Sequence, residues 1–298
     1  MAAAFPLILA FAAAAPLPSI EAIRTWQART VRIHEIAWRL QSRNAAHCPV
    51  TRMGYGFTTI YLQEDTPPDM RQRWADALQI EGLATIAMVG SNSPAASDMR
   101  PGDSVLAVNG TRWGKTAAEQ APFVKALNER NFQPSLTMSL KRGDRMIDVA
   151  LDARRVCAGD VFLINSRKTN ASASGTNIAV DSGLEALLSS DDELAFVIAH
   201  EFAHIGLGHS SADQAKAIKD RSQRFAMEKA ADALGIRWVL RAGYAPEAAA
   251  QAHPKIVKAN RAPISGLLGL HGPYMAPKAR AAFLAQEAAA ARREAAAE

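Results

Sequence analysis

The sequence is poor in aromatic residues and in long apolar runs, and each shortage excludes a class of protein. Aromatic side chains make up only 6% of its 298 residues. The Lys and Arg that give a net charge of +5 are spread along the chain rather than clustered with aromatics, so we expect no nucleic acid partner. No stretch after the N-terminal segment is long and apolar enough to cross a bilayer, so we expect no stable membrane span in the mature protein.

Charge is missing from the N-terminus, where no charged side chain precedes Glu21. An apolar run that ends in small residues and prolines is typical of a secretory signal peptide, here over residues 1–19, although the usual Lys or Arg near the start is absent. We therefore expect cleavage and export to the periplasm or another extracytoplasmic space. Two alternatives stay open: an uncleaved segment that anchors the protein in a membrane, and an apolar N-terminal helix of the fold.

Hydrophobic periodicity predicts an α+β fold, and 49% hydrophobic residues supply a core for one large domain or two smaller ones. Short elements fill the middle of the chain, and longer helices lie near its end. The predicted strands cover residues 54–62, 82–89, 104–110, 135–151 as a hairpin, 161–166 and 177–183. The predicted helices cover residues 20–47, 70–80, 116–130, 191–206, about 213–242 and 278–298.

The stretch "SPAASDMRPGDSVLAVNG" contains a strand closed by Asn109-Gly110, which is a strong tight-turn signal. It resembles the segment that PDZ domains carry between their second and third strands, and we place the PDZ-like module at residues 79–154. The chain departs from PDZ domains at the peptide-binding loop, where a Gly-Leu-Gly-Phe-like turn is usual and "EGLATI" stands here. The resemblance implies an inserted β-rich module with a peptide or protein as its partner.

Only two cysteines are present, Cys48 before this module and Cys157 just after it. In an exported protein they are expected to pair, and the bridge would join the two parts of the host domain across the insertion. The chain-entropy model gives a loop of this length about 4–5 kcal/mol of stabilisation as an upper figure. In a cytosolic protein the same residues would be two buried thiols.

The clearest chemical signal is the stretch "ELAFVIAHEFAHIGLGHS". On a helix, His200 and His204 lie one turn apart on the same face, so both imidazoles can reach one ion about 2 Å away. Glu201 can reach a water on that ion, which is the H-E-x-x-H arrangement of zinc peptidases. The apolar flanks predict a buried helix, where these polar groups without a partner would cost several kcal/mol, and Zn2+ would be that partner. The alternative is a pair of helix histidines satisfied by hydrogen bonds.

A catalytic zinc site needs a third protein ligand and one position open to water. His209 lies five residues after His204, where a continuing helix turns it away from the ligand face, so we interpret it as a helix-end or surface histidine. Glu228 and Asp232 lie four residues apart on the next predicted helix. Glu228 would complete a His2Glu site, and Asp232 could accept a hydrogen bond from a ligand imidazole. The alternative is two solvated acids on a surface helix.

The H-E-x-x-H helix is followed by "EKAADALGIRWVLRAGYAPEAAA" and later by "LHGPYMAPKARAAF". Together these stretches resemble the gluzincin metallopeptidases of the family that contains HtpX and the CaaX prenyl endopeptidases. By resemblance, His200, His204 and Glu228 are the zinc ligands, Glu201 is the catalytic base and Asp232 orients a ligand. The best-known members span membranes several times, whereas this chain is similar to the soluble, exported branch.

The resemblance also implies a mainly helical zincin-type domain with a small sheet. Its N-terminal part covers residues 20–78, its catalytic part covers 155–285, and an Ala-rich helical tail covers 286–298. His271 is the first candidate to stabilise the reaction oxyanion, ahead of Tyr274 and Arg280, although Gly272 stands where the family usually has Pro. His271 could instead be a fourth ligand or a surface loop histidine.

The implied activity is zinc-dependent cleavage of unfolded or flexible protein segments, as part of envelope protein quality control. The strand at residues 176–180 would be an edge that pairs with the extended substrate backbone. One rival is an exported PDZ-type adaptor whose peptidase half is inactive. A second rival is a zinc hydrolase that acts on something other than peptides.

Overall fold

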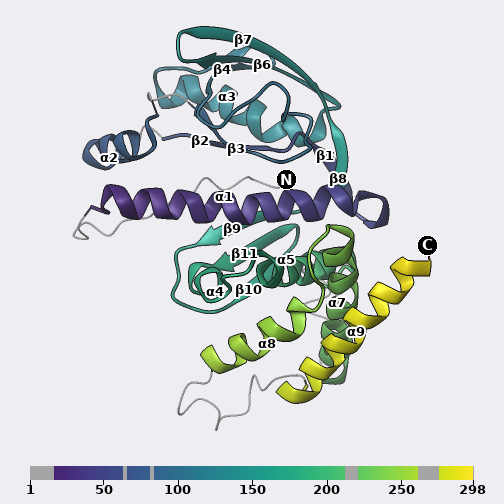
Figure 1. Cartoon of the computed structure of the whole chain (residues 1–298). Helices are drawn as coiled ribbons and strands as arrows, with labels where there is room; N and C mark the ends of the chain where they lie inside the picture. The colour runs from purple at the N-terminus through teal and green to yellow at the C-terminus, as the bar shows by residue number, and fades with distance from the viewer. Residues whose placement is uncertain (1–16, 63–65, 81–83, 212–220, 261–274, 298) are drawn as a thin grey trace. The chain divides into compact units, whose positions relative to one another are not determined.

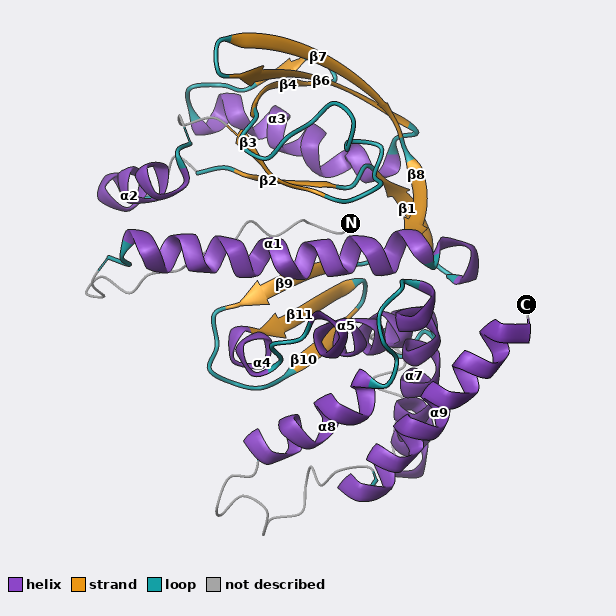
Figure 2. Cartoon of the chain, in the orientation of Figure 1, coloured by secondary structure: helices purple, strands orange, loops and turns teal. Residues whose placement is uncertain are grey.

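The structure is a computed structural model and describes residues 17–62, 66–80, 84–211, 221–260 and 275–297 (Figure 1). The chain forms two compact units. Unit 1 comprises residues 1–35 and 52–155, and unit 2 comprises residues 36–51 and 156–298. Most strands belong to unit 1 and most helices to unit 2 (Figure 2). This mixture is compatible with the predicted α+β class, and most of the predicted signal segment lies outside the described residues.

The amphipathic helix expected at residues 20–47 is α1 (Ile20–Arg43), which is followed by a 3-10 turn at Ala45–His47. The chain passes from unit 1 to unit 2 within this helix, at Ile36. Near its start, Ile23 packs in an apolar cluster with side chains of α2 (Pro68–Leu78). Among the described residues, no helix is both long enough and apolar enough to cross a membrane.

Unit 1 is built on an antiparallel sheet in the order β2-β3-β4-β6-β7, with the short β5 paired to β4. Its strands are β2 (Phe57–Ile60), β3 (Ala84–Val89), β4 (Ser104–Val108), β5 (Thr111–Arg112), β6 (Ser135–Arg142) and β7 (Arg145–Asp152). The tight turn predicted at Asn109-Gly110 joins β4 to β5, and the predicted hairpin is β6–β7. Every second residue of β6 from Leu136 to Leu140 is buried, which is the pattern of a sheet with one face on a core.

One helix, α3 (Ala117–Glu129), contributes Phe123 and Leu127 to that core. It begins at Thr116, whose side chain accepts a hydrogen bond from the Glu119 N–H while the Glu119 carboxylate accepts one from the Thr116 N–H. β2 pairs with β3 in the same sheet, so unit 1 includes residues before 79. Residue 79 is the predicted start of the PDZ-like module. A separate pair, β1 (Thr51–Gly54) and β8 (Arg154–Cys157), lies where the chain passes between the units.

Unit 2 contains a three-stranded sheet in the order β10-β11-β9. Its strands are β10 (Ala171–Ser174), β11 (Asn177–Asp181) and β9 (Asp160–Ile164). β11 is antiparallel to β10 and parallel to β9, so it is the central strand. The expectation that residues 176–180 form a free edge is therefore wrong, because the strand β10, which the sequence analysis did not predict, covers one side of β11.

The helices of unit 2 are α4 (Ser182–Leu187), α5 (Asp191–Gly206), α7 (Arg221–Arg241), α8 (Ala248–Ala259) and α9 (Pro277–Ala297). α5 begins at Ser190, whose side chain accepts a hydrogen bond from the Asp192 N–H, and acidic residues fill its first turn. It is buried on nearly every side, as its apolar sequence predicts. α7 and α8 pack against α5, and α9 packs against α7 and α8.

The predicted disulfide between Cys48 and Cys157 is confirmed, and both cysteines belong to unit 2. Their Cα atoms lie 5.5 Å apart, although 109 positions separate them in the sequence. The buried Gln41 side chain on α1 donates hydrogen bonds to the carbonyl oxygens of Cys157, at 3.1 Å, and Gly159, at 2.6 Å. The bridge and Gln41 together fix the chain where it re-enters unit 2.

Candidate metal site

The site lies on α5 and α7, which approach closely because a glycine stands between them. A Cβ atom at Gly235 of α7 would lie 3.0 Å from the backbone nitrogen of His200 on α5. A glycine inside a helix weakens that helix, so its presence here is explained by the close contact. Glu228 and Asp232 lie on α7 at positions that turn both carboxylates toward α5.

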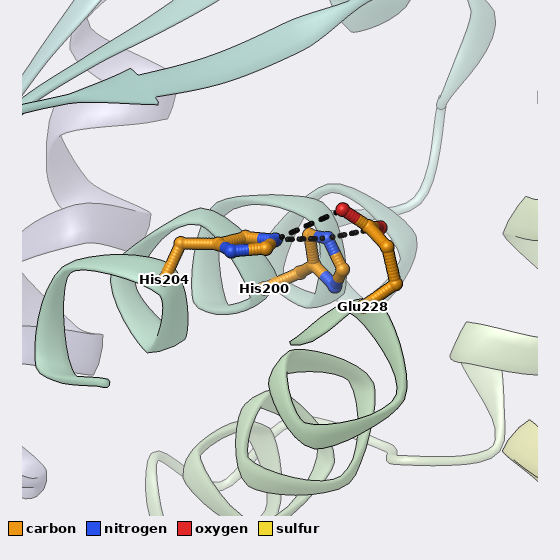
Figure 3. A group of neighbouring side chains, drawn as sticks. All are labelled: His200, His204 and Glu228. Atoms are coloured by element: carbon orange, nitrogen blue, oxygen red, sulfur yellow. Dashed lines mark hydrogen bonds and ion pairs between the residues drawn. The ribbon is translucent and has the colours of Figure 1, made fainter. Parts of the chain in front are cut away.

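Three side chains converge on one point, as Figure 3 shows for His200, His204 and Glu228. The Nε2 atoms of the two histidines are 3.1 Å apart. The Glu228 carboxylate lies 3.4 Å from His200 Nε2 through one oxygen and 3.5 Å from His204 Nε2 through the other. Four-coordinate zinc, with bonds of about 2.0–2.1 Å, holds its ligand atoms roughly 3.3 Å apart. The two imidazoles and the carboxylate therefore supply the donor types of a His2Glu zinc site at distances close to those that zinc sets between its ligands.

Asp232 and Arg280 lie behind His200. The Nδ1 atom of His200 is 2.9 Å from Asp232 Oδ1, and Arg280 of α9 donates two hydrogen bonds to the same carboxylate, at 2.9 and 2.8 Å. Burial opposes a charge on His200, but the carboxylates of Asp232 and Glu228 outweigh it and raise the pKa of His200 to about 10 in the metal-free protein. The same histidine lowers the pKa of Asp232 and of Glu228 against the effect of their burial.

Glu201 follows the first histidine and is 8% exposed. Burial raises the pKa of its carboxyl group above the ordinary value, although His200, His204 and a hydrogen bond from the Ala173 backbone N–H act in the opposite direction. Ala173 pairs with Ile178 one step from the two-residue turn of the β10–β11 hairpin. At such a position the N–H and C=O point away from the partner strand. The outer edge of β10 therefore faces Glu201.

His204 has a different partner, His209, which stands just beyond the end of α5. Their Nδ1 atoms are 3.1 Å apart, and the ring centroids are 5.1 Å apart. His209 is a helix-end histidine, as predicted, and it is not among the three converging side chains. The helix ends at Gly206 and the chain reverses direction there, which brings the His209 ring beside His204, a contact that the sequence did not predict. Partial burial and the nearby His204 lower the pKa of His209.

The candidates for stabilising the oxyanion were His271, Tyr274 and Arg280. Two nitrogens of Arg280 donate hydrogen bonds to Asp232, and one of them also lies 3.7 Å from the Glu228 carboxylate. His271 and Tyr274 lie outside the described residues. The sequence analysis missed His209 as a neighbour of His204 and missed Gly235. A glycine in the middle of a predicted helix was the available signal for Gly235.

Comparison with known families identifies part of the chain. Residues 144–223 match the profile of Peptidase family M48. The M48 match contains His200, Glu201 and His204 but ends before Glu228 and Asp232. Within the PDZ-like module it overlaps only the last strand, β7. It supports a peptidase, in a family whose members are zinc metallopeptidases, and hence a polypeptide substrate. A search of curated proteins found no significant match.

Proposed function

We propose that the protein is a zinc-dependent endopeptidase. The observation that carries this proposal is the convergence of His200, His204 and Glu228 with donor atoms spaced as zinc requires, beside a buried Glu201. Three protein ligands leave a fourth position for water, as catalytic zinc sites do. Bound zinc would polarise the scissile carbonyl and lower the pKa of that water to about 7.

The residues of this chain have distinct tasks in the proposed reaction. Glu201 takes a proton from the attacking water and returns it to the leaving amine. Asp232 accepts a hydrogen bond from the Nδ1–H of His200, which leaves the Nε2 lone pair to face the ion. Arg280 holds Asp232 in place through two hydrogen bonds.

The substrate is proposed to be an unfolded or flexible protein segment. Among the described strands, β10 has a neighbour on one side only, and its outer edge faces Glu201. An extended polypeptide that adds to this edge gains main-chain hydrogen bonds, which folded regions cannot supply. This preference suits protein quality control in the cell envelope, after removal of the proposed signal peptide. β10 thus takes the place that the sequence analysis assigned to β11.

The direct test compares wild-type protein with Glu201→Gln on denatured casein. Wild type should cleave it, lose activity with a chelator and regain activity with zinc. Glu201→Gln should keep its zinc but be slower by about 10²–10⁴-fold, the usual contribution of a general base. Zinc-loaded wild type that cleaves no denatured protein would favour a hydrolase for other substrates. A biological role that survives Glu201→Gln unchanged would favour the adaptor.

We also propose that unit 1 binds a peptide or protein at the edge strand β2, which has β3 as its only neighbour among the described strands. The run Gly54-Tyr55-Gly56-Phe57 leads into β2, whose first residue is Phe57. We propose this run, and not "EGLATI", as the counterpart of the Gly-Leu-Gly-Phe-like turn of PDZ domains. Phe57 is buried in the same apolar cluster as Phe123 and Leu127 of α3. Fluorescence titration should show that peptides with an apolar C-terminal residue bind and that the same peptides amidated at the terminus bind more weakly. Equal affinities would contradict capture of the carboxylate.

A further inference from the structure

His209 owes its position to the way α5 ends. Gly208 adopts a left-handed conformation with φ of +74°, which glycine accepts without strain. The Gly208 N–H donates to the Ile205 carbonyl at 3.0 Å, and the His209 N–H donates to the His204 carbonyl at 2.8 Å. These two bonds form a Schellman motif, in which the second residue after the helix cap returns over the residue three before the cap. In this chain those two residues are His209 and His204.

The segment after the turn is also fixed. The Ser210 hydroxyl donates to the Gly175 carbonyl at 2.7 Å, and the Gly175 N–H donates to the Ser210 carbonyl at 2.9 Å. Gly175 belongs to the turn between β10 and β11. His209 is therefore held from both sides, by the helix end before it and by the sheet turn after it. An apolar pair usually fills the contact that the Schellman motif creates, whereas two imidazoles fill it here.

The direction of the hydrogen bond follows from the ligand role of His204. A neutral imidazole carries one N–H donor and one lone-pair acceptor. If the His204 Nε2 lone pair faces the ion, its Nδ1 must carry the proton and donate it. His209 Nδ1, 3.1 Å away, is then the acceptor, and its proton must sit on Nε2.

We propose that His209 is a positioning residue for the metal ligand His204, which it holds by accepting a hydrogen bond from His204 Nδ1. The inference rests on the metal site proposed above. The partner of His200 is the buried Asp232 carboxylate, whereas the partner of His204 is the half-buried, neutral imidazole of His209. Outer partners of this kind fix the tautomer and ring plane of a ligand, and their loss typically costs about 10–100-fold in metal affinity.

The test uses two variants of nearly equal shape, His209→Asn and His209→Leu. The Asn side-chain oxygen occupies the place of the histidine Nδ1 and can accept the same hydrogen bond, whereas Leu cannot. Zinc affinity, measured by competition with a chelator, should fall about 10–100-fold in His209→Leu and only a few-fold in His209→Asn. Melting temperatures of the metal-free proteins control for folding.

The zinc affinities of the two variants and of wild type separate the role of His209 from the metal site itself. Wild-type affinity in His209→Leu, or an equal loss in both variants, would overturn the role of His209. Wild-type protein that binds no zinc would overturn the proposed metal site itself, which is a different result. A second measurement needs no variant: long-range 1H–15N spectra of the zinc-loaded protein should show His209 protonated at Nε2 and His204 at Nδ1. A proton on His209 Nδ1 would contradict the inference.

Discussion

The two units bury charged side chains in different ways. In unit 1, Asp103 is 1% exposed and both of its oxygens have partners within the unit. Arg142 donates to the two oxygens at 2.6 and 2.7 Å, and the Arg100 N–H donates to one of them at 2.8 Å. This group is complete in itself, as buried ionised groups in stable folds usually are.

In unit 2, the group around His200 is only partly closed. Asp232 is satisfied by Arg280 and His200, much as Asp103 is satisfied by Arg142. The two Nε2 atoms and the Glu228 carboxylate instead converge on a point between α5 and α7. Because Asp103 and Asp232 are buried and paired in the same way, the burial of a charge does not by itself mark a functional site. In the metal-free protein a protonated His200 pairs with both Asp232 and Glu228, and at the point where the donor atoms converge a metal ion could take the place of that proton.

The largest effect should come from exchanging one residue in each group. His204→Ala removes a ligand, so bound zinc should fall from about one ion per chain to nearly none. Asp103→Asn should keep the zinc of wild type and lower the free energy of unfolding by about 1–3 kcal/mol, because it weakens a buried hydrogen-bond network. Metal analysis and denaturant unfolding of both variants would measure this. Equal zinc contents in His204→Ala and wild type would remove the distinction between the groups.

Removal of zinc should have the next largest effect. A ligand present at 100 times its dissociation constant stabilises the folded state by about 2.7 kcal/mol. For a protein of this size the melting temperature should then rise by roughly 5–10 °C on zinc addition to the chelated protein. Calorimetry on His204→Ala is the control and should show no zinc-dependent shift. A shift of equal size in that variant would place the ion elsewhere.

The metal-free protein should respond to pH with a smaller effect. The pKa of His200 is raised from 6.5 to about 10, so its stabilising contribution is present below pH 6.5 and is lost as the pH rises toward 10. The pKa values of Glu228 and Asp232 are lowered, so their contributions are present above the ordinary carboxyl range and are lost on acidification. The melting temperature in chelator should therefore fall by a few degrees between pH 6.5 and 10.

Zinc affinity should change in the opposite direction over the same range, because the ion must displace the proton of His200. His200→Asn removes the titrating group and should flatten the alkaline limb of the stability profile. A wild-type profile without an alkaline limb would contradict the coupling between His200 and its two carboxylates.

The smallest effect is expected from Gly235→Ala. The added methyl group would press on the His200 backbone, and overpacking of about 1–3 kcal/mol exceeds the gain of about 0.5–1 kcal/mol from better helix propensity. Zinc affinity should fall a few-fold. Gly114→Ala in unit 1 is the matched control, since its methyl group would lie 2.1 Å from Glu119 Cβ, and it should cost stability without changing zinc affinity. Equal zinc affinity in both variants would show that the helix contact does not tune the site.

Local sequence patterns predicted the elements that carry the proposed ligands. The i, i+4 spacing of His200 and His204 predicted the face of α5 that carries them, and the spacing of Glu228 and Asp232 predicted the face of α7. The disulfide was predictable because only two cysteines were available to pair. These features depend on spacing within one element or on a count, which a sequence states directly.

The errors have a common physical origin in long-range pairing and in chain reversal. β10 has the weak pattern "ASAS", so its pairing to β11 and the loss of the free edge there were not visible in the sequence. The contact between His209 and His204 was not visible in the sequence either, because it depends on the reversal of the chain after Gly206. The pairing of β2 with β3 was also not visible in the sequence, because a helix lies between the two strands along the chain.

The bridge between Cys48 and Cys157 has a consequence for any damage to the intervening chain. All of residues 52–155 lie between the two cysteines. A single nick made by a protease anywhere in that stretch would leave both fragments covalently attached. The nicked molecule would migrate as one species until a reductant separated it into two.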